Sequence, residues 1–249
     1  MKLLTSLLLS LFAVQVAAAD LKVLSTNALT DVISEELAHL EKRLGSKIAI
    51  EFKPTNILLE RLKGGEHADV WILGRGALID LDKQGKIAAG TRVDIAQSGV
   101  ALSIKDGVAK PDISTAEGFK QALLSAKAIA SSRVGLSGLH FMSVLDRLGI
   151  ADQVKPKVKI VDGGGRTAEL IVRGEADMAV QLMSELLSVK GTQVVGTFPK
   201  GLDNNVVLTG GVSSAAKDPK AAKAFLDLLM EPAMLPVLKR NGMERPPAY

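Results

Sequence analysis

The sequence predicts an α/β fold built around a largely parallel sheet. Short apolar segments alternate with amphipathic helical segments along the chain, which is the pattern of repeated β–α units. The apolar segment at residues 68–73 is continuous, as expected for a strand that is buried on both faces of a parallel sheet. Polar, Gly- or Ser-rich segments follow several strands, at the sheet edge where α/β proteins bind ligands.

The first part of the chain contains three strands and three helices by this reading. The chain begins with a strand at 21–24. The helix expected next, at 29–44, carries one apolar stripe, formed by Leu29, Ile33, Leu37, Leu40 and Leu44. The elements that follow are a strand at 48–52, a short helix that ends at Gly64 and Gly65, the strand at 68–73 and a helix at 77–84.

The second part of the chain repeats the alternation. The expected strands are 99–104, 128–130, 158–161, 178–181, 193–195 and 206–208. The expected helices are 116–126, one capped by Ser137, one from Arg166 to Arg173 that stops at Gly174, and one that begins at Asp218 and Pro219.

The amino terminus indicates export. Residues 1–19 place one Lys before an apolar stretch that ends in Ala17, Ala18 and Ala19, which is the order of a cleavable secretory signal. The apolar stretch is too short to span a bilayer comfortably, and no Cys is present to carry a lipid anchor. We therefore expect a periplasmic protein that is not embedded in the membrane after cleavage before Asp20.

Composition excludes several classes of function. The 249 residues include no Cys and only three His, which argues against thiolate or histidine metal sites, iron–sulfur clusters and cysteine nucleophiles. Aromatic residues make up 3% of the chain, too few for nucleic-acid stacking platforms. Loss of Lys2 with the signal leaves 30 basic and 27 acidic residues, a net charge of +3 that indicates no nucleic-acid partner. The sequence indicates no cofactor and no metal, and we expect a monomer.

Five polar turns predict an anion site. They lie at residues 25–27, 53–56, 131–137 and 163–167 and in the segment after Gln181. Backbone N–H groups at the starts of helices attract anions without a metal ion. Turns that follow parallel strands meet at one edge of the sheet, so these segments are expected to converge.

Three segments carry a family resemblance. They are LKVLSTNALTDVISEELAHLEK, LLERLKGGEHADVWIL and IVRGEADMAVQLMSEL. These segments resemble the molybdate-binding-like branch of periplasmic type II solute-binding proteins, as does the C-terminal segment DPKAAKAFLDLLMEPAMLPVLKRNGME. The branch also resembles exported aconitate isomerases. The resemblance implies two lobes that clamp an anion in a cleft and are joined by a two-strand hinge. Residues 20–96 plus 206–249 would form lobe 1 and residues 97–205 would form lobe 2.

The resemblance also implies a set of ligand-binding residues. Matched position by position, the first anion loop contains Ser25, Thr26 and Asn27, the second Thr55 and Asn56, the third Ser137 and Gly138, and the fourth Arg166 and Thr167. A Tyr of the family falls at Gln181, and Arg166 is a second departure. A guanidinium pairs bidentately with a planar carboxylate, so these departures favour a di- or tricarboxylate over molybdate, with Arg75 as a possible second cation.

Each of these residues also has a purely structural interpretation. Ser25 and Thr26 could cap the first helix, and Gln181 could be a satisfied core amide. Arg166 at a helix start opposes the helix dipole, which favours an anion partner over simple solvation. An exposed Arg75 needs no ligand to explain it.

Two functions from different classes remain open. The first is a solute-binding component of an ABC-type transporter or sensor, which closes on a small anion. The second is a metal-independent isomerase that interconverts cis- and trans-aconitate by an allylic proton shift in the same cleft. That chemistry needs a base, for which His140 and Lys53 are the candidates, although a surface role for His140 and a solvated Lys53 are also consistent with the sequence.

Overall fold

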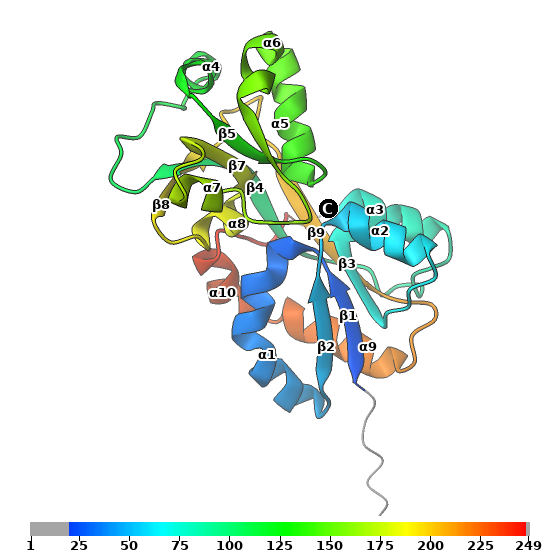
Figure 1. Cartoon of the computed structure of the whole chain (residues 1–249). Coiled ribbons are helices and arrows are strands. Elements are labelled where there is room, and N and C mark those ends of the chain that lie inside the picture. The colour runs from blue at the N-terminus through cyan, green and yellow to red at the C-terminus, as the bar shows by residue number, and fades with distance from the viewer. Residues whose placement is uncertain (1–19, 248–249) are drawn as a thin grey trace, which may run out of the picture.

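The structure is a computed structural model that describes residues 20–247, and its elements form two lobes joined by two long strands (Figure 1). Residues 1–19, where the signal peptide is predicted, lie outside the described residues. Lobe 1 contains β1 (Leu21–Ser25), η1 (Asn27–Leu29), α1 (Thr30–Leu44), β2 (Ile48–Phe52), α2 (Thr55–Lys63), β3 (Val70–Gly74), α3 (Arg75–Lys83), α9 (Pro219–Met230) and α10 (Met234–Arg240).

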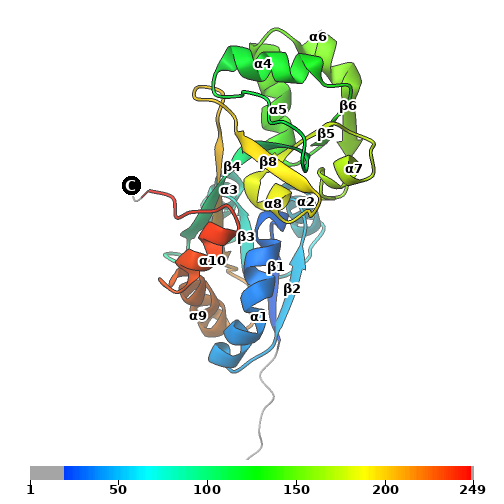
Figure 2. The same ribbon diagram turned by 90° about the vertical axis from the view of Figure 1, so that its left-hand side faces the viewer.

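Lobe 2 is the smaller sheet with its covering helices. It contains α4 (Ala116–Ser125), β5 (Ile129–Ser132), α5 (Leu136–Arg147), α6 (Ala151–Val154), η2 (Lys155–Lys157), β6 (Val158–Val161), α7 (Glu169–Val172), β7 (Met178–Leu182), α8 (Met183–Leu187) and β8 (Thr192–Thr197). Seen from the side, the two lobes stack one above the other with α8 between them (Figure 2).

The two long strands β4 (Val93–Lys105) and β9 (Asn205–Val212) run between the lobes. The strand order is β2-β1-β3-β9-β4-β7-β5-β6, with β8 also paired to β4. The first half of β4 pairs antiparallel with β9, and its second half pairs with β7 of lobe 2. One continuous sheet therefore passes through both lobes and turns between them.

Parallel pairing explains the composition of the central strands. β1 lies parallel to β2 and β3, and all five residues of β3 are buried. Trp71 in β3 is 1% exposed and packs in the core of lobe 1. In lobe 2, β5 lies parallel to β6 and β7. The segments after β1, β2, β5, β6 and β7 consequently face the space between the lobes.

The predicted fold class is confirmed, including the two lobes and the pair of strands between them. The helix predicted from Arg166 is much shorter: α7 begins only at Glu169, and Arg166 lies in the irregular segment before it. Residues 166–168 instead form tighter turns, in which Glu169 N donates to Arg166 O and Leu170 N donates to Thr167 O, each three residues back. The exact lobe boundaries stay a prediction.

Candidate functional site

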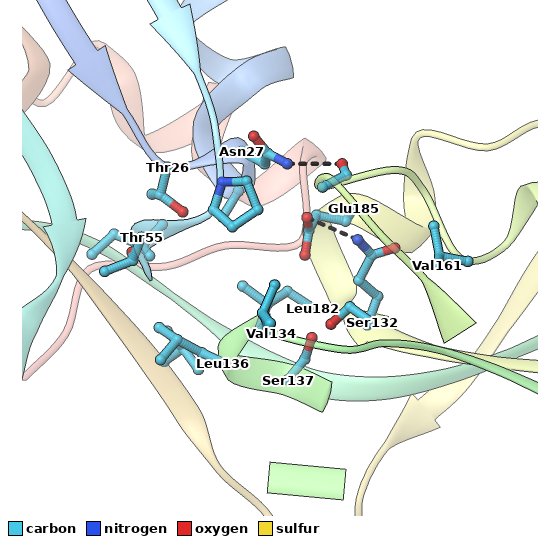
Figure 3. A pocket seen from close by; sticks show the side chains of 17 residues that line it. Thr26, Asn27, Thr55, Ser132, Val134, Leu136, Ser137, Val161, Leu182 and Glu185 are labelled. Carbon is cyan, nitrogen blue, oxygen red and sulfur yellow. Dashed lines mark hydrogen bonds between the residues drawn. The ribbon is translucent and has the colours of Figure 1, made fainter. Parts of the chain in front are cut away.

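A cavity lies between the two lobes, at the carboxyl ends of the parallel strands (Figure 3). It measures about 40 Å³, enough for a few water molecules, so the lobes are nearly closed on each other. Its lining residues are Thr26, Asn27, Ala28, Pro54, Thr55, Ser132, Val134, Gly135, Leu136, Ser137, Val161, Gly164, Gln181, Leu182, Glu185, Val206 and Leu208.

Both lobes contribute hydroxyl groups to the cavity. Thr26 and Thr55 come from lobe 1, and Ser132 and Ser137 come from lobe 2. Thr26 lies just before η1, Thr55 is the first residue of α2 and Ser137 is in the first turn of α5. The backbone N–H groups of a first helical turn have no partner within the helix. Hydroxyls and free N–H groups thus converge on the cavity, which is an arrangement that suits an anion.

Ser132 has the most informative environment of these four. Its side chain is 7% exposed, and its Oγ has no hydrogen-bond partner among the described residues. Sequence reasoning placed it in a polar turn but did not select it as a ligand residue. A buried hydroxyl without a partner loses its hydration without compensation, unless something bound in the cavity supplies a hydrogen bond.

Gly135 and Gly138 both lie close to Ser132. A Cβ atom at Gly135 would lie 2.5 Å from Ser132 Oγ, and one at Gly138 would lie 2.0 Å from the Ser132 carbonyl oxygen. Gly138, predicted as a ligand-binding residue, is outside the cavity lining. Its absent side chain instead allows α5 to begin directly against the end of β5.

Gln181, which occupies the family's Tyr position, lines the cavity, but its amide is bonded within the protein. Its Oε1 accepts hydrogen bonds from Thr167 N (2.8 Å) and Thr167 Oγ1 (3.0 Å). Its Nε2 donates to Gly165 O (3.3 Å) and to Glu185 Oε1 (2.9 Å). Thr167 is fully buried and is not among the lining residues. Gln181 therefore holds the 163–167 segment in place and orients Glu185.

Glu185 is a second cavity residue, after Ser132, that sequence reasoning did not select. It lies in the first turn of α8 and is the one titratable side chain among the described residues that line the cavity. Burial raises the pKa of its carboxyl to about 7, against the lowering effects of the Leu182 backbone, Arg166 and Gln181. Gln181 lies in β7 and Glu185 in the short helix that follows it, so no helical spacing in the sequence indicated that the two side chains meet.

Two polar contacts cross between the lobes beside the cavity. Asn27 Nδ2 donates to Gly164 O at 2.8 Å (Figure 3). Arg166 donates through both terminal nitrogens to the carboxylate of Asp31, at 3.1 and 3.2 Å. Arg166 is thus paired with a carboxylate of the opposite lobe and does not line the cavity. Residues more than a hundred positions apart form both contacts, so no local pattern could indicate them.

Arg75 is also outside the cavity lining. Its guanidinium donates to Asp94 of β4 at 2.6 and 3.2 Å, and Thr209 of β9 donates to the same carboxylate. Arg75 faces an adjoining groove that shares Thr55 and Leu136 with the cavity. It connects α3 to the two strands between the lobes.

The remaining predicted residues lie near the cavity or away from it. Ser25 is fully buried and its hydroxyl donates to Thr26 O, whereas Asn56 is outside the lining. Lys53 lies 3.9 Å from Glu51. His140 Nε2 is 2.7 Å from the carbonyl oxygen of Leu202, and His140 is not among the lining residues. All of these assignments stay predictions.

The described residues contain no group of three or more His, Asp or Glu side chains that could hold a metal ion. Within residues 20–247, no helix has the length and apolar character needed to cross a bilayer.

Fold and site together define a two-lobed solute-binding protein of the type that closes on a small ligand. The chain belongs to the bacterial extracellular solute-binding protein family, whose model matches residues 21–244. It is 31% identical to an aconitate isomerase from a Pseudomonas species, over 92% of this chain and 88% of the relative. It is 26% identical to the molybdate-binding protein ModA of Escherichia coli, over 91% of this chain and 86% of the relative.

Solved structures agree on the fold. The periplasmic molybdate-binding protein of Azotobacter vinelandii superposes with a TM-score of 0.75 at 19% identity, over 92% of this chain and all of that one. The resemblance to the molybdate-binding-like branch is therefore confirmed at the level of family and fold.

Proposed function

We propose that this protein is an exported clamp that binds a small di- or tricarboxylate between its lobes. The observation that carries the proposal is the convergence of four hydroxyls, two from each lobe, on one cavity in which Ser132 Oγ has no protein partner among the described residues. Neutral O–H and N–H donors from both sides hold an anion only when the lobes are closed, so the ligand stabilises closure.

The apolar part of the lining favours a carboxylate over a bare oxyanion. The cavity walls include Val134, Leu136, Val161, Leu182 and Leu208. These side chains can pack against the carbon skeleton of a polycarboxylate, whereas molybdate presents only oxygen atoms. A ligand of that size requires the lobes to part further than they do here and then to close around it. In a transporter or sensor, an ABC permease or a receptor would recognise the closed form.

Isothermal titration calorimetry tests the proposal with tricarballylate, citrate, cis- and trans-aconitate and molybdate. We expect a polycarboxylate to bind at least tenfold more tightly than molybdate. Ser132→Ala should weaken that binding by about 10- to 100-fold, because it removes a buried hydrogen bond to a charged ligand. Ser143→Ala, on the exposed side of the same α5 helix, is the matched control and should leave affinity unchanged. Tighter binding of molybdate would reject a carboxylate as the ligand.

A second candidate function is aconitate isomerisation, which the 31% identity to an aconitate isomerase and the position of Glu185 favour. A base in the cavity would remove a proton from the carbon next to the double bond, and the pair of electrons would shift the double bond before a proton returns to the other carbon. Hydroxyl and N–H donors would hold the charge that develops on the adjacent carboxylate. With a pKa near 7, Glu185 is suited to both proton transfers.

Proton NMR in D₂O separates the two candidates. Catalytic amounts of protein are added to cis-aconitate and, separately, to trans-aconitate. Growth of the other isomer with deuterium incorporation, lost in Glu185→Gln, supports the enzyme. Ligand line broadening without a new isomer supports binding alone.

A further inference from the structure

Glu185 is held firmly at the wall of the cavity. Its Oε1 accepts the hydrogen bond from Gln181 Nε2, and the Gln181 amide is itself fixed by two bonds from Thr167. The carboxyl therefore faces the same space as the Ser132 and Ser137 hydroxyls (Figure 3). An anion that accepts hydrogen bonds from those hydroxyls would lie beside the Glu185 carboxyl.

Two charged side chains act on Glu185, and they pair with each other. Arg166 favours the ionised carboxylate and Asp31 opposes it. Because their side chains lie 3.1 Å apart in an ion pair, the two effects partly offset each other. The carboxyl thus lacks a cation of its own that would keep it ionised.

The elements packed against α8 add little charge. The main contacts to α8 come from β4, β7, β8 and η1, and β7, β8 and η1 contain no charged residue. The two in β4 lie near its ends: Asp94, paired with Arg75, and Lys105, which is exposed. Gly242 also approaches α8, and the nearby Glu244 carboxylate accepts a hydrogen bond from Gln97.

We propose that Glu185 holds the bound anion as a neutral carboxylic acid, so that above pH 7 the cleft takes up close to one proton with each anion. The inference rests on the proposed function, since it requires an anion in the cavity. A neutral carboxyl donates an O–H hydrogen bond to the anion, whereas an ionised one offers only acceptor oxygens and repels it. The proton comes from solvent on binding and returns to solvent on release.

The acid–base balance of the free cleft makes this uptake measurable. Because burial raises the pKa of Glu185 to about 7, the carboxyl is largely protonated at pH 5.5 and largely ionised at pH 8.5. A bound anion raises the pKa further. Affinity for an anion that does not itself titrate in this range, such as molybdate, should therefore be constant at acidic pH, and affinity for either probe should fall about tenfold per pH unit above pH 7.

Calorimetric titrations of the mature protein between pH 5.5 and 8.5 test the proposal. The probes are tricarballylate, which has no double bond to isomerise, and molybdate, and both are fully ionised above pH 7. Titration at pH 8 in two buffers of different ionisation enthalpy should show close to one proton taken up per anion. Glu185→Gln keeps the size and a hydrogen-bond donor but cannot titrate, so above pH 7, where both probes are fully ionised, its affinity should not vary with pH. Glu117→Gln, in the exposed first turn of α4, should behave as wild type.

Two variants distinguish the electrostatic effect on the pKa of Glu185 from the loss of the Arg166–Asp31 ion pair between the lobes. Arg166→Gln and Asp31→Asn break the same ion pair, so any effect of that contact on closure is common to both. Arg166→Gln should move the midpoint of the pH dependence upward, and Asp31→Asn should move it downward.

The results distinguish failure of the inference from failure of the proposed function. Binding of either probe with no proton uptake and no fall in affinity at alkaline pH would overturn the inference alone. A pH dependence that persists in Glu185→Gln would do the same, because another group would then carry the proton. If neither anion binds, the proposed function fails and the inference fails with it.

Discussion

Burial of the Glu185 carboxyl opposes folding at alkaline pH. Its pKa is about 7 in the folded protein and 4.5 for the free side chain. The folded state thus holds the proton more tightly than the unfolded state, so the contribution of Glu185 to stability falls as pH rises from about 4.5 to 7 and is constant above. By pH 8 the loss amounts to roughly 2–3 kcal/mol.

This loss predicts the behaviour of Glu185→Gln in urea unfolding experiments. Relative to wild type, the variant should gain roughly 2–3 kcal/mol of unfolding free energy between pH 4.5 and pH 8, because its amide does not ionise. Glu117→Gln, which replaces an exposed carboxyl, should show no comparable gain. A difference from wild type that is the same at both pH values would contradict a raised pKa for Glu185.

Among single residues, the sequence predicted the hydroxyl and amide positions better than the charged ones. Thr26, Asn27, Thr55, Ser137 and Gln181 line the cavity, because each lies near the end of a strand or the start of a helix, and such positions are visible in a local pattern. Ser25, Asn56 and Thr167 do not line it. The sequence favoured an anion partner for Arg166 and left Arg75 open between a second ligand contact and an exposed side chain. Their aspartate partners belong to other segments of the chain, and a local pattern carries no information on such pairs.

At the scale of elements, hydrophobic patterning located the long helices and the buried strands within a few residues. It missed three short helices, α6 with four residues, α8 with five and α10 with seven. Such helices are too short for an apolar stripe to repeat, so tertiary packing determines them. The missed α8 is the element that brings Glu185 into the cavity, which explains why sequence reasoning overlooked that residue.

The start of α9 provides a prediction at this scale. Asp218 Oδ1 accepts a hydrogen bond from Ala221 N at 2.9 Å and caps the helix, which buries Phe225 and Leu226 against the core of lobe 1. Asp218→Ala should lower the unfolding free energy by about 1 kcal/mol. Asp227→Ala on the same helix removes an exposed pair with Lys223 and should change it by less than about 0.5 kcal/mol. Equal effects of the two substitutions in urea unfolding would reject the capping role.

At the scale of the whole molecule, closure depends on a close approach between the lobes at Gly164. A Cβ atom there would lie 2.3 Å from Asn27 Nδ2 and 2.7 Å from Pro54 Cδ, both in lobe 1. The neighbouring Gly163 also has a positive φ, but a Cβ atom at Gly163 would meet nothing within 4 Å. The two glycines therefore share the same backbone requirement and differ in whether a side chain would obstruct the opposite lobe.

This difference predicts that alanine substitutions at the two glycines differ in their effects on closure and anion binding. Both Gly163→Ala and Gly164→Ala should lower stability by about 1 kcal/mol through strain at positive φ. Gly164→Ala should also hold the lobes apart, and should weaken anion binding at least tenfold, because the ligand reaches donors of both lobes only when they close. Small-angle X-ray scattering with saturating tricarballylate should show compaction for wild type and Gly163→Ala and a larger radius of gyration for Gly164→Ala. If Gly164→Ala closes and binds as tightly as Gly163→Ala, the Asn27–Gly164 contact is not part of the closed, ligand-bound state.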